Sequence, residues 1–85
     1  MYYAYMVRCA DGTLYSGYAA NLDERIRTHN AGRGAKYTRA RRPVALAYYE
    51  SFEDKQDAMR REYAFKQLTR AQKEALIAQG EISHE

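Results

Sequence analysis

The chain has 85 residues and a net charge of +3, a length that allows one domain built around a single core. We expect neither a signal peptide nor a membrane span, because Arg8 and Asp11 interrupt the apolar N-terminus. The lone Cys9 excludes an internal disulfide, and with only His29 and His84 available it cannot complete a zinc cage. These features favour a protein of the reducing cytoplasm.

The first predicted elements are two strands joined by a turn. Residues 2–9 and 13–19 are rich in aromatic and apolar side chains, which is typical of strands. Between them, the Ala-Asp-Gly sequence at 10–12 indicates a hairpin turn.

Two registers of this hairpin have to be compared. A two-residue loop would place Tyr5 and Tyr15 on opposite faces of the sheet. A three-residue loop with Gly12 left-handed instead pairs Tyr5 with Gly17, and both tyrosines then share one face within aromatic reach. We predict this second register, in which Gly17 leaves open space beside the two hydroxyls.

A helix is predicted directly after the hairpin. Asn21 is a favourable N-cap with Glu24 at the capping-box position, and Gly32 marks the end of the helix. Arg25 and His29 are four residues apart, so they share one face of this helix. Taken alone, Arg25 is better explained as a solvated cation and His29 as an amphipathic residue on the helix surface.

The segment from Arg25 to Arg42 contains seven Lys and Arg residues and no acidic residue. These cations repel one another unless solvent or a polyanion screens them. A solvated basic loop is one explanation, but we favour a phosphate-binding surface because the loop follows the Arg25 helix directly. The residues predicted to bind nucleic acid are Arg33, Lys36, Tyr37, Thr38, Arg39, Arg41 and Arg42.

A third strand and a second helix follow the basic segment. Residues 44–52 alternate larger and small side chains, as a strand does. The helix is expected to start near Asp54, with Met59 and Tyr63 on its buried side.

The last helix is predicted to begin at Thr69, since Thr69 and Gln72 have capping-box spacing, and to end at Gly80. Residues 81–85 are expected to form a frayed tail. Residues 1–80 would then form one α+β domain in the order ββαβαα, a small three-stranded antiparallel sheet flanked by helices.

Several short motifs occur in order along the chain, namely Tyr3-Ala4-Tyr5, Tyr15-Ser16-Gly17, Arg25 with His29, and Glu62. Together with "CADG", "GAKYTR" and "RRPV", they resemble the GIY-YIG nuclease superfamily, above all its small stand-alone bacterial branch, UPF0213 or YhbQ-like. The resemblance implies one divalent ion, Mg²⁺ or Mn²⁺, with Glu62 as its ligand. It also implies that the catalytic positions are Tyr5, Tyr15, Arg25, His29 and Glu62.

The chain differs from the superfamily pattern at three places. Tyr3 stands where the first motif has glycine, and Ser16 stands where the second has isoleucine. Many members carry an asparagine after the glutamate helix, whereas the only asparagines here are Asn21 and Asn30.

The residue types suit phosphodiester hydrolysis. Arginine neutralises charge at phosphorus, and one carboxylate is enough for a hydrated Mg²⁺ that also binds substrate oxygens. We expect Tyr15 to accept a proton from the attacking water while Tyr5 or His29 orients that water. A nearby Arg25 would assist by lowering the pKa of a tyrosine. An ion pair with Lys66 is the alternative explanation for Glu62.

Two functions follow from these features. The first is a metal-dependent endonuclease that hydrolyses DNA and leaves 5′-phosphate and 3′-hydroxyl ends, as the resemblance implies. The second is a nucleic-acid-binding module with a vestigial site. Since no recognition module is evident, we expect selectivity for single-stranded or branched DNA rather than for sequence, in DNA repair or processing.

Overall fold

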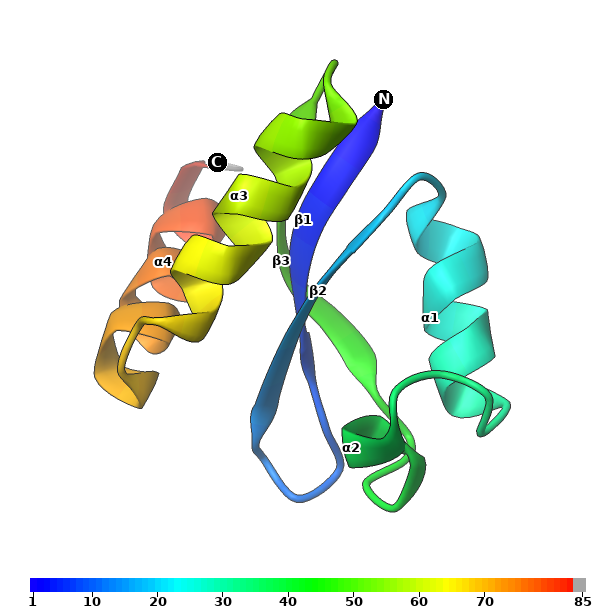
Figure 1. Cartoon of the computed structure of the whole chain (residues 1–85). Helices are drawn as coiled ribbons and strands as arrows, with labels where there is room; N and C mark the ends of the chain where they lie inside the picture. The colour runs from blue at the N-terminus through cyan, green and yellow to red at the C-terminus, as the bar shows by residue number, and fades with distance from the viewer. Residues whose placement is uncertain (84–85) are drawn as a thin grey trace.

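The computed structural model describes residues 1–83 and confirms the α+β class. The predicted order is observed with one addition, a short helix inside the basic segment that the sequence did not reveal. The elements are β1 Tyr2–Arg8, β2 Leu14–Ala19, α1 Leu22–Asn30, α2 Lys36–Arg39, β3 Ala45–Phe52, α3 Lys55–Lys66 and α4 Arg70–Ser83 (Figure 1).

The three strands form an antiparallel sheet in the order β2-β1-β3, so the first strand is central. Tyr5 pairs with Gly17 and Val7 with Tyr15. Gly12 has a φ of 85°, the left-handed conformation that a three-residue turn requires. The predicted register is therefore confirmed, and both tyrosines lie on the same face of the sheet.

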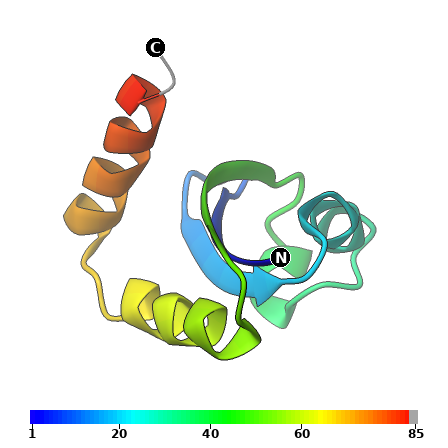
Figure 2. The ribbon, with the colours of Figure 1, turned by 90° about the horizontal axis from the view of Figure 1, so that it is seen from above.

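Helices cover the two faces of the sheet separately, as Figure 2 shows from above. On one face, Tyr5 and Val7 form a core with Cys9, against which residues of α1 pack. On the other face, Met6 packs with Phe65 of α3 and residues of α4. The α3 helix also lies against β2, an edge strand, which brings it close to the face that α1 covers.

The predicted helix starts are confirmed by their capping hydrogen bonds. The Asn21 side chain accepts from the backbone N–H of Glu24 at 3.1 Å, and Asp54 caps α3 in the same way. The Thr69 hydroxyl accepts from the Gln72 N–H at 3.2 Å, and the Gln72 side chain accepts from the Thr69 N–H at 2.9 Å. Two such reciprocal bonds satisfy donors that a helix start otherwise leaves unpaired.

The predicted orientation of α3 is wrong. Met59 and Tyr63 are 41% and 68% exposed, whereas the fully buried residues of this helix are Ala58 and Phe65. The small Ala58 allows α3 to pack closely on the sheet. Arg61, which looks like a surface residue in the sequence, is half-buried beside the sheet.

The predicted end of α4 is also wrong, because the helix continues past Gly80 to Ser83. A Cβ atom at Gly80 would lie 3.1 Å from the Tyr48 ring, so the glycine allows close packing and does not end the helix. Of the predicted frayed tail, residues 84–85 lie outside the described residues. Among the helices of residues 1–83, none has the length and apolar character needed to cross a bilayer.

Candidate active site

The five residues predicted to be catalytic line one cleft with a volume of about 410 Å³. They come from four elements, β1, β2, α1 and α3, and lie where α3 passes the edge strand β2. Gly17, Gly34 and Ala35 contribute small residues to the same cleft. The predicted catalytic residues are Tyr5, Tyr15, Arg25, His29 and Glu62.

Tyr5 and His29 form a buried hydrogen bond, with the phenol oxygen 2.9 Å from Nε2 of the imidazole. Each residue is only 1% exposed, which excludes the alternative that His29 is a solvated surface residue. A Cβ atom at Gly17 would lie 2.5 Å from the Tyr5 hydroxyl oxygen. The ring of Tyr5 therefore occupies the space that glycine leaves open on the neighbouring strand.

Tyr15 is half-buried and touches both the histidine and the basic segment. Its ring meets the His29 ring edge-on, with centroids 5.6 Å apart, and stacks with the Tyr37 ring at 5.9 Å. The Arg41 guanidinium lies 4.0 Å over the Tyr37 ring. Tyr37, predicted to bind nucleic acid, thus makes two contacts within the protein and supports Tyr15.

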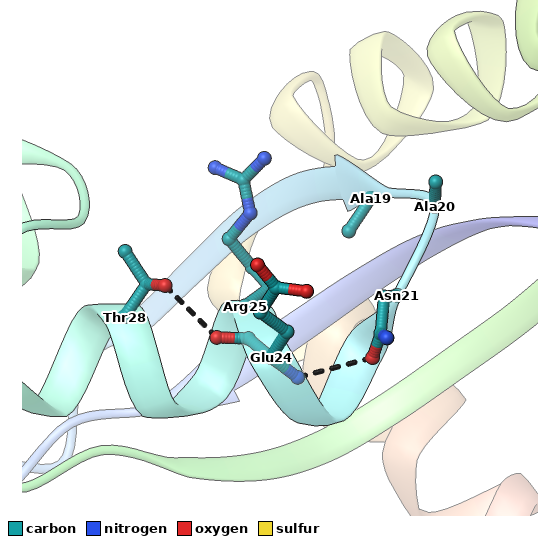
Figure 3. A pocket seen from close by; sticks show the side chains of 6 residues that line it. All are labelled: Ala19, Ala20, Asn21, Glu24, Arg25 and Thr28. Carbon is teal, nitrogen blue, oxygen red and sulfur yellow. Dashed lines mark hydrogen bonds between the residues drawn. The ribbon is translucent and has the colours of Figure 1, made fainter.

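Arg25 extends from α1 beside β2, as Figure 3 shows. It lines the cleft and also a neighbouring hollow at the start of α1, which contains Asn21 and Thr28. Within residues 1–83 its guanidinium makes no ion pair, and the residue is exposed. This cation is therefore available to a phosphate that enters the cleft.

Burial and the Arg25 charge together set the protonation of the Tyr5–His29 pair. Burial raises the pKa of Tyr5 far above its ordinary value, and the lowering by Arg25 is the smaller effect. Burial also lowers the pKa of His29, and Arg25 lowers it further. At neutral pH, Tyr5 is therefore a phenol and His29 a neutral imidazole.

Glu62 is the carboxylate that α3 brings to the cleft, and its side chain is 20% exposed. Its oxygen lies 3.2 Å from Nζ of Lys66, the ion pair that the spacing predicts. Among residues 1–83, no three His, Cys, Asp or Glu side chains converge to form a cage for a metal. A single accessible carboxylate does fit a hydrated Mg²⁺, which commonly takes one or two carboxylates together with substrate phosphates.

One residue of the predicted nucleic-acid surface is placed differently by the structure. Thr38 is fully buried, so its assignment as a nucleic-acid contact is corrected. Its hydroxyl oxygen lies 2.9 Å from Nδ1 of His29. A Cβ atom at Gly34 would overlap that same nitrogen, which explains the glycine before the short helix. In the sequence, only the "GAKYTR" motif pointed to Thr38 as part of the site.

The other predicted phosphate contacts fall into two groups. Arg41 forms an ion pair with Asp11 at 3.1 Å, so an acid from the hairpin neutralises part of the loop's charge. Arg42 donates to the carbonyl oxygens of Arg39 and Asn30, at 2.9 and 3.3 Å. Among the predicted nucleic-acid residues, the exposed cations with no such bonds within residues 1–83 are Arg33, Lys36 and Arg39.

Comparison with known proteins agrees with this geometry. The sequence model of the GIY-YIG catalytic domain matches residues 1–75 of the 85-residue chain. The chain belongs to the GIY-YIG family. Since α3 ends at Lys66, the match includes every element that lines the cleft.

Relatives of this GIY-YIG protein occur in both archaea and bacteria. A UPF0213 protein of Halobacterium salinarum is 58% identical over 77 residues, which covers 91% of this chain and 100% of the relative. A UPF0213 protein of Pediococcus pentosaceus is 55% identical and covers 96% of this chain and 86% of the relative. These values place the chain in the UPF0213 branch.

Solved structures support the fold independently. The solution NMR structure of the UPF0213 protein from Bacillus halodurans is similar with a TM-score of 0.58 and 46% identity, covering 92% of this chain and 84% of that one. The solution NMR structure of a protein from E. faecalis is similar with a TM-score of 0.63 and 41% identity, covering 99% and 90%. The GIY-YIG domain implies nuclease activity and a nucleic-acid substrate.

Proposed function

We propose that this GIY-YIG protein is a divalent-metal-dependent endonuclease that hydrolyses DNA phosphodiester bonds. The observation that carries the proposal is the single cleft in which two tyrosines, an arginine, a histidine and a glutamate meet. Water attacks phosphorus, the bond to the 3′ oxygen breaks, and the products carry 5′-phosphate and 3′-hydroxyl ends.

Each cleft residue has a role in this reaction. Arg25 binds non-bridging phosphate oxygens and neutralises the charge that develops on them. Tyr15 accepts a proton from the attacking water, and Tyr5, anchored by His29, orients that water. Glu62 would hold Mg²⁺ or Mn²⁺. When bound, the ion supplies positive charge that stabilises the leaving 3′ oxygen.

The exposed cations of the basic segment support a role in holding the substrate. Lys36 and Arg39 are the first and last residues of α2, and Arg33 lies just before it. Because α2 packs near α1, these cations can neutralise phosphates beyond the scissile one. Phosphate contacts position a nucleic acid without reading its sequence. We therefore propose selectivity for single-stranded or branched DNA, in repair or processing within the reducing cytoplasm.

A nucleic-acid-binding module with a vestigial site is the second candidate. The observation that favours it is the Lys66 ammonium, 3.2 Å from Glu62, which competes with an ion for the carboxylate. Both candidates bind DNA in a salt-dependent way, but only the enzyme needs the metal.

Cleavage assays with end-labelled substrates decide between the two candidates. Single-stranded, duplex and branched DNA, and RNA of the same sequence, are incubated with the protein in Mg²⁺, Mn²⁺ or EDTA. The endonuclease gives internal cuts that EDTA abolishes, with 5′-phosphate ends. Binding without cleavage in either metal would leave the binding module as the function.

A further inference from the structure

Three buried side chains and one carbonyl form a continuous hydrogen-bonded chain behind the cleft. The Tyr5 hydroxyl is 2.9 Å from His29 Nε2, and His29 Nδ1 is 2.9 Å from the Thr38 hydroxyl. The Thr38 hydroxyl in turn donates to the Ala35 carbonyl at 2.9 Å. Tyr5, His29 and Thr38 are 1%, 1% and 0% exposed, so protein groups rather than bulk water set the proton positions.

The direction of this chain follows from its last member. A carbonyl only accepts, and a threonine hydroxyl has a single proton, which points at Ala35. The oxygen of Thr38 therefore presents a lone pair to His29, so Nδ1 must carry the imidazole proton. A neutral imidazole has one N–H, which leaves Nε2 bare, and Tyr5 must then donate to it. Burial and Arg25, which lower the pKa of His29, keep the ring neutral.

We propose that Thr38 is a positioning residue that fixes His29 in the Nδ1-protonated tautomer, so that the Tyr5 oxygen is kept as an acceptor in the cleft. In this state the Tyr5 proton is directed at Nε2, and its remaining lone pairs can receive a hydrogen bond from water. In the other tautomer, Nε2–H would donate to Tyr5, and the phenol would present its proton to the cleft instead.

The backbone around Thr38 is built to bring its hydroxyl to the histidine. A Cβ atom at Gly34 would overlap Nδ1 of His29, so this loop approaches closely only with glycine there. The Ala35 carbonyl also accepts from the N–H groups of Thr38 and Arg39, at 3.1 and 3.2 Å. The hydroxyl bond, at 2.9 Å, is the shortest of the three.

The consequence for catalysis rests on the proposed nuclease function, but the tautomer does not. Nitrogen NMR of the protein with ¹⁵N-labelled histidine, without DNA, reports which ring nitrogen carries the proton. A His84→Asn variant assigns the signals. In the wild type, Nδ1 is expected to give the signal of a protonated nitrogen and Nε2 that of a bare one. The reverse pattern in the wild type would overturn the proposal.

Two variants then test whether Thr38 is the cause. Thr38→Val keeps the shape but leaves Nδ1–H without an acceptor, and an unpaired buried donor is unfavourable, so the proton should move to Nε2. Thr38→Ser keeps the hydroxyl and should retain the wild-type spectrum. In the cleavage assay, Thr38→Val should lower kcat about 100-fold with KM unchanged. Thr38→Ser should keep most of the wild-type kcat.

The outcomes separate the two proposals. A wild-type tautomer in Thr38→Val, or normal cleavage by that variant, would refute the positioning role while the nuclease function stands. Absence of cleavage by the wild type would refute the nuclease function, and the spectra would still decide the tautomer. If Thr38→Val does not fold, the wild-type spectrum and Thr38→Ser carry the test.

Discussion

The hydroxyl of Tyr5 lies 2.9 Å from Nε2 of His29, so the central strand and the first helix meet in one buried hydrogen bond. The contact sets the position of α1 relative to the sheet at the point where Arg25, on the same helix, reaches the cleft. Disturbing the pair should therefore affect both packing and chemistry, whereas changes at the cleft surface should affect chemistry alone.

Replacing Glu62 tests the metal. Glu62→Gln keeps the side-chain shape and loses one half-exposed ion pair with Lys66, which contributes about 0.5 kcal/mol or less to stability. We expect normal folding, DNA binding at least equal to wild type, and no cleavage. The control is Asp57→Asn, which breaks another ion pair of α3, with Arg60 at the same distance of 3.2 Å but outside the cleft, and should cleave normally. Wild-type cleavage by Glu62→Gln would reduce this glutamate to an ion-pair partner.

Replacing Arg25 tests phosphate recognition. Arg25→Ala should fold normally, because the guanidinium makes no ion pair within residues 1–83, but it should bind DNA more weakly and lose cleavage. Arg27→Ala removes an equal charge from the same helix outside the cleft and serves as the control. Affinity and single-turnover rates are measured for both. Equal losses in the two variants would show a general charge effect and no specific clamp.

The basic segment should contain two kinds of cation, those that bind phosphates and those that stabilise the fold. Replacing Arg33, Lys36 and Arg39 with alanine should reduce the slope of log affinity against log salt by about 0.7 to 0.9 per lost phosphate contact. The melting temperature should not change, since all three are exposed. Arg42→Ala should instead destabilise the fold by about 0.5 to 1 kcal/mol, because it loses two carbonyl acceptors. An unchanged slope in the triple variant would exclude the segment from the interface.

Stability should depend on pH through His29. Burial and Arg25 lower its pKa in the folded protein, whereas the unfolded chain has the ordinary value of 6.5. The unfolded state thus binds more protons than the folded state just below pH 6.5. The contribution of His29 to the free energy of unfolding is therefore complete above that pH and is lost as the pH falls. The urea concentration at the unfolding midpoint should decrease as the pH is lowered from about 7 to about 5. In His29→Gln this decrease should be smaller. The lowered carboxyl pKa values of Asp11 and Glu74 act only at lower pH.

Gly17 should tolerate no side chain. Gly17→Ala places a methyl group against the Tyr5 hydroxyl, so we expect about 1 to 3 kcal/mol of destabilisation and loss of cleavage. Ser16→Ala, next to it on the opposite face, removes a buried hydroxyl for which the described residues offer no hydrogen-bond partner, and it should be neutral or slightly stabilising. Chemical denaturation measures both. A neutral Gly17→Ala would show that the Tyr5 ring is free to move.

The hairpin and the helix starts could be predicted because their determinants are local. Gly12 sets the turn, and Thr69 with Gln72 sets a cap, within a few residues of sequence. The orientation of α3 could not be predicted, since Met59 and Tyr63 are apolar and yet exposed. The position of the sheet decides which face of this helix is buried, and the local sequence does not contain that position. In the same way, Thr38 had no local sign of burial.

The end of α4 illustrates a competition between local and distant contacts. Gly80 carries a local stop signal, but the Tyr48 ring needs the space beside it, and the helix continues. The candidate site was accessible to prediction through ordered motifs, although its support by Tyr37, Thr38 and Gly34 depends on contacts between distant elements.

The full burial of Ala58 has a consequence for how the cleft can change. This methyl group faces inward from α3, four residues before Glu62, so its volume sets how closely that helix can approach the strands. A larger side chain there would move the helix outward and carry the carboxylate away from the tyrosines without touching either. The width of the cleft therefore depends on a core residue that does not line it, and substitutions at Ala58 are expected to change the distance between Glu62 and the tyrosines.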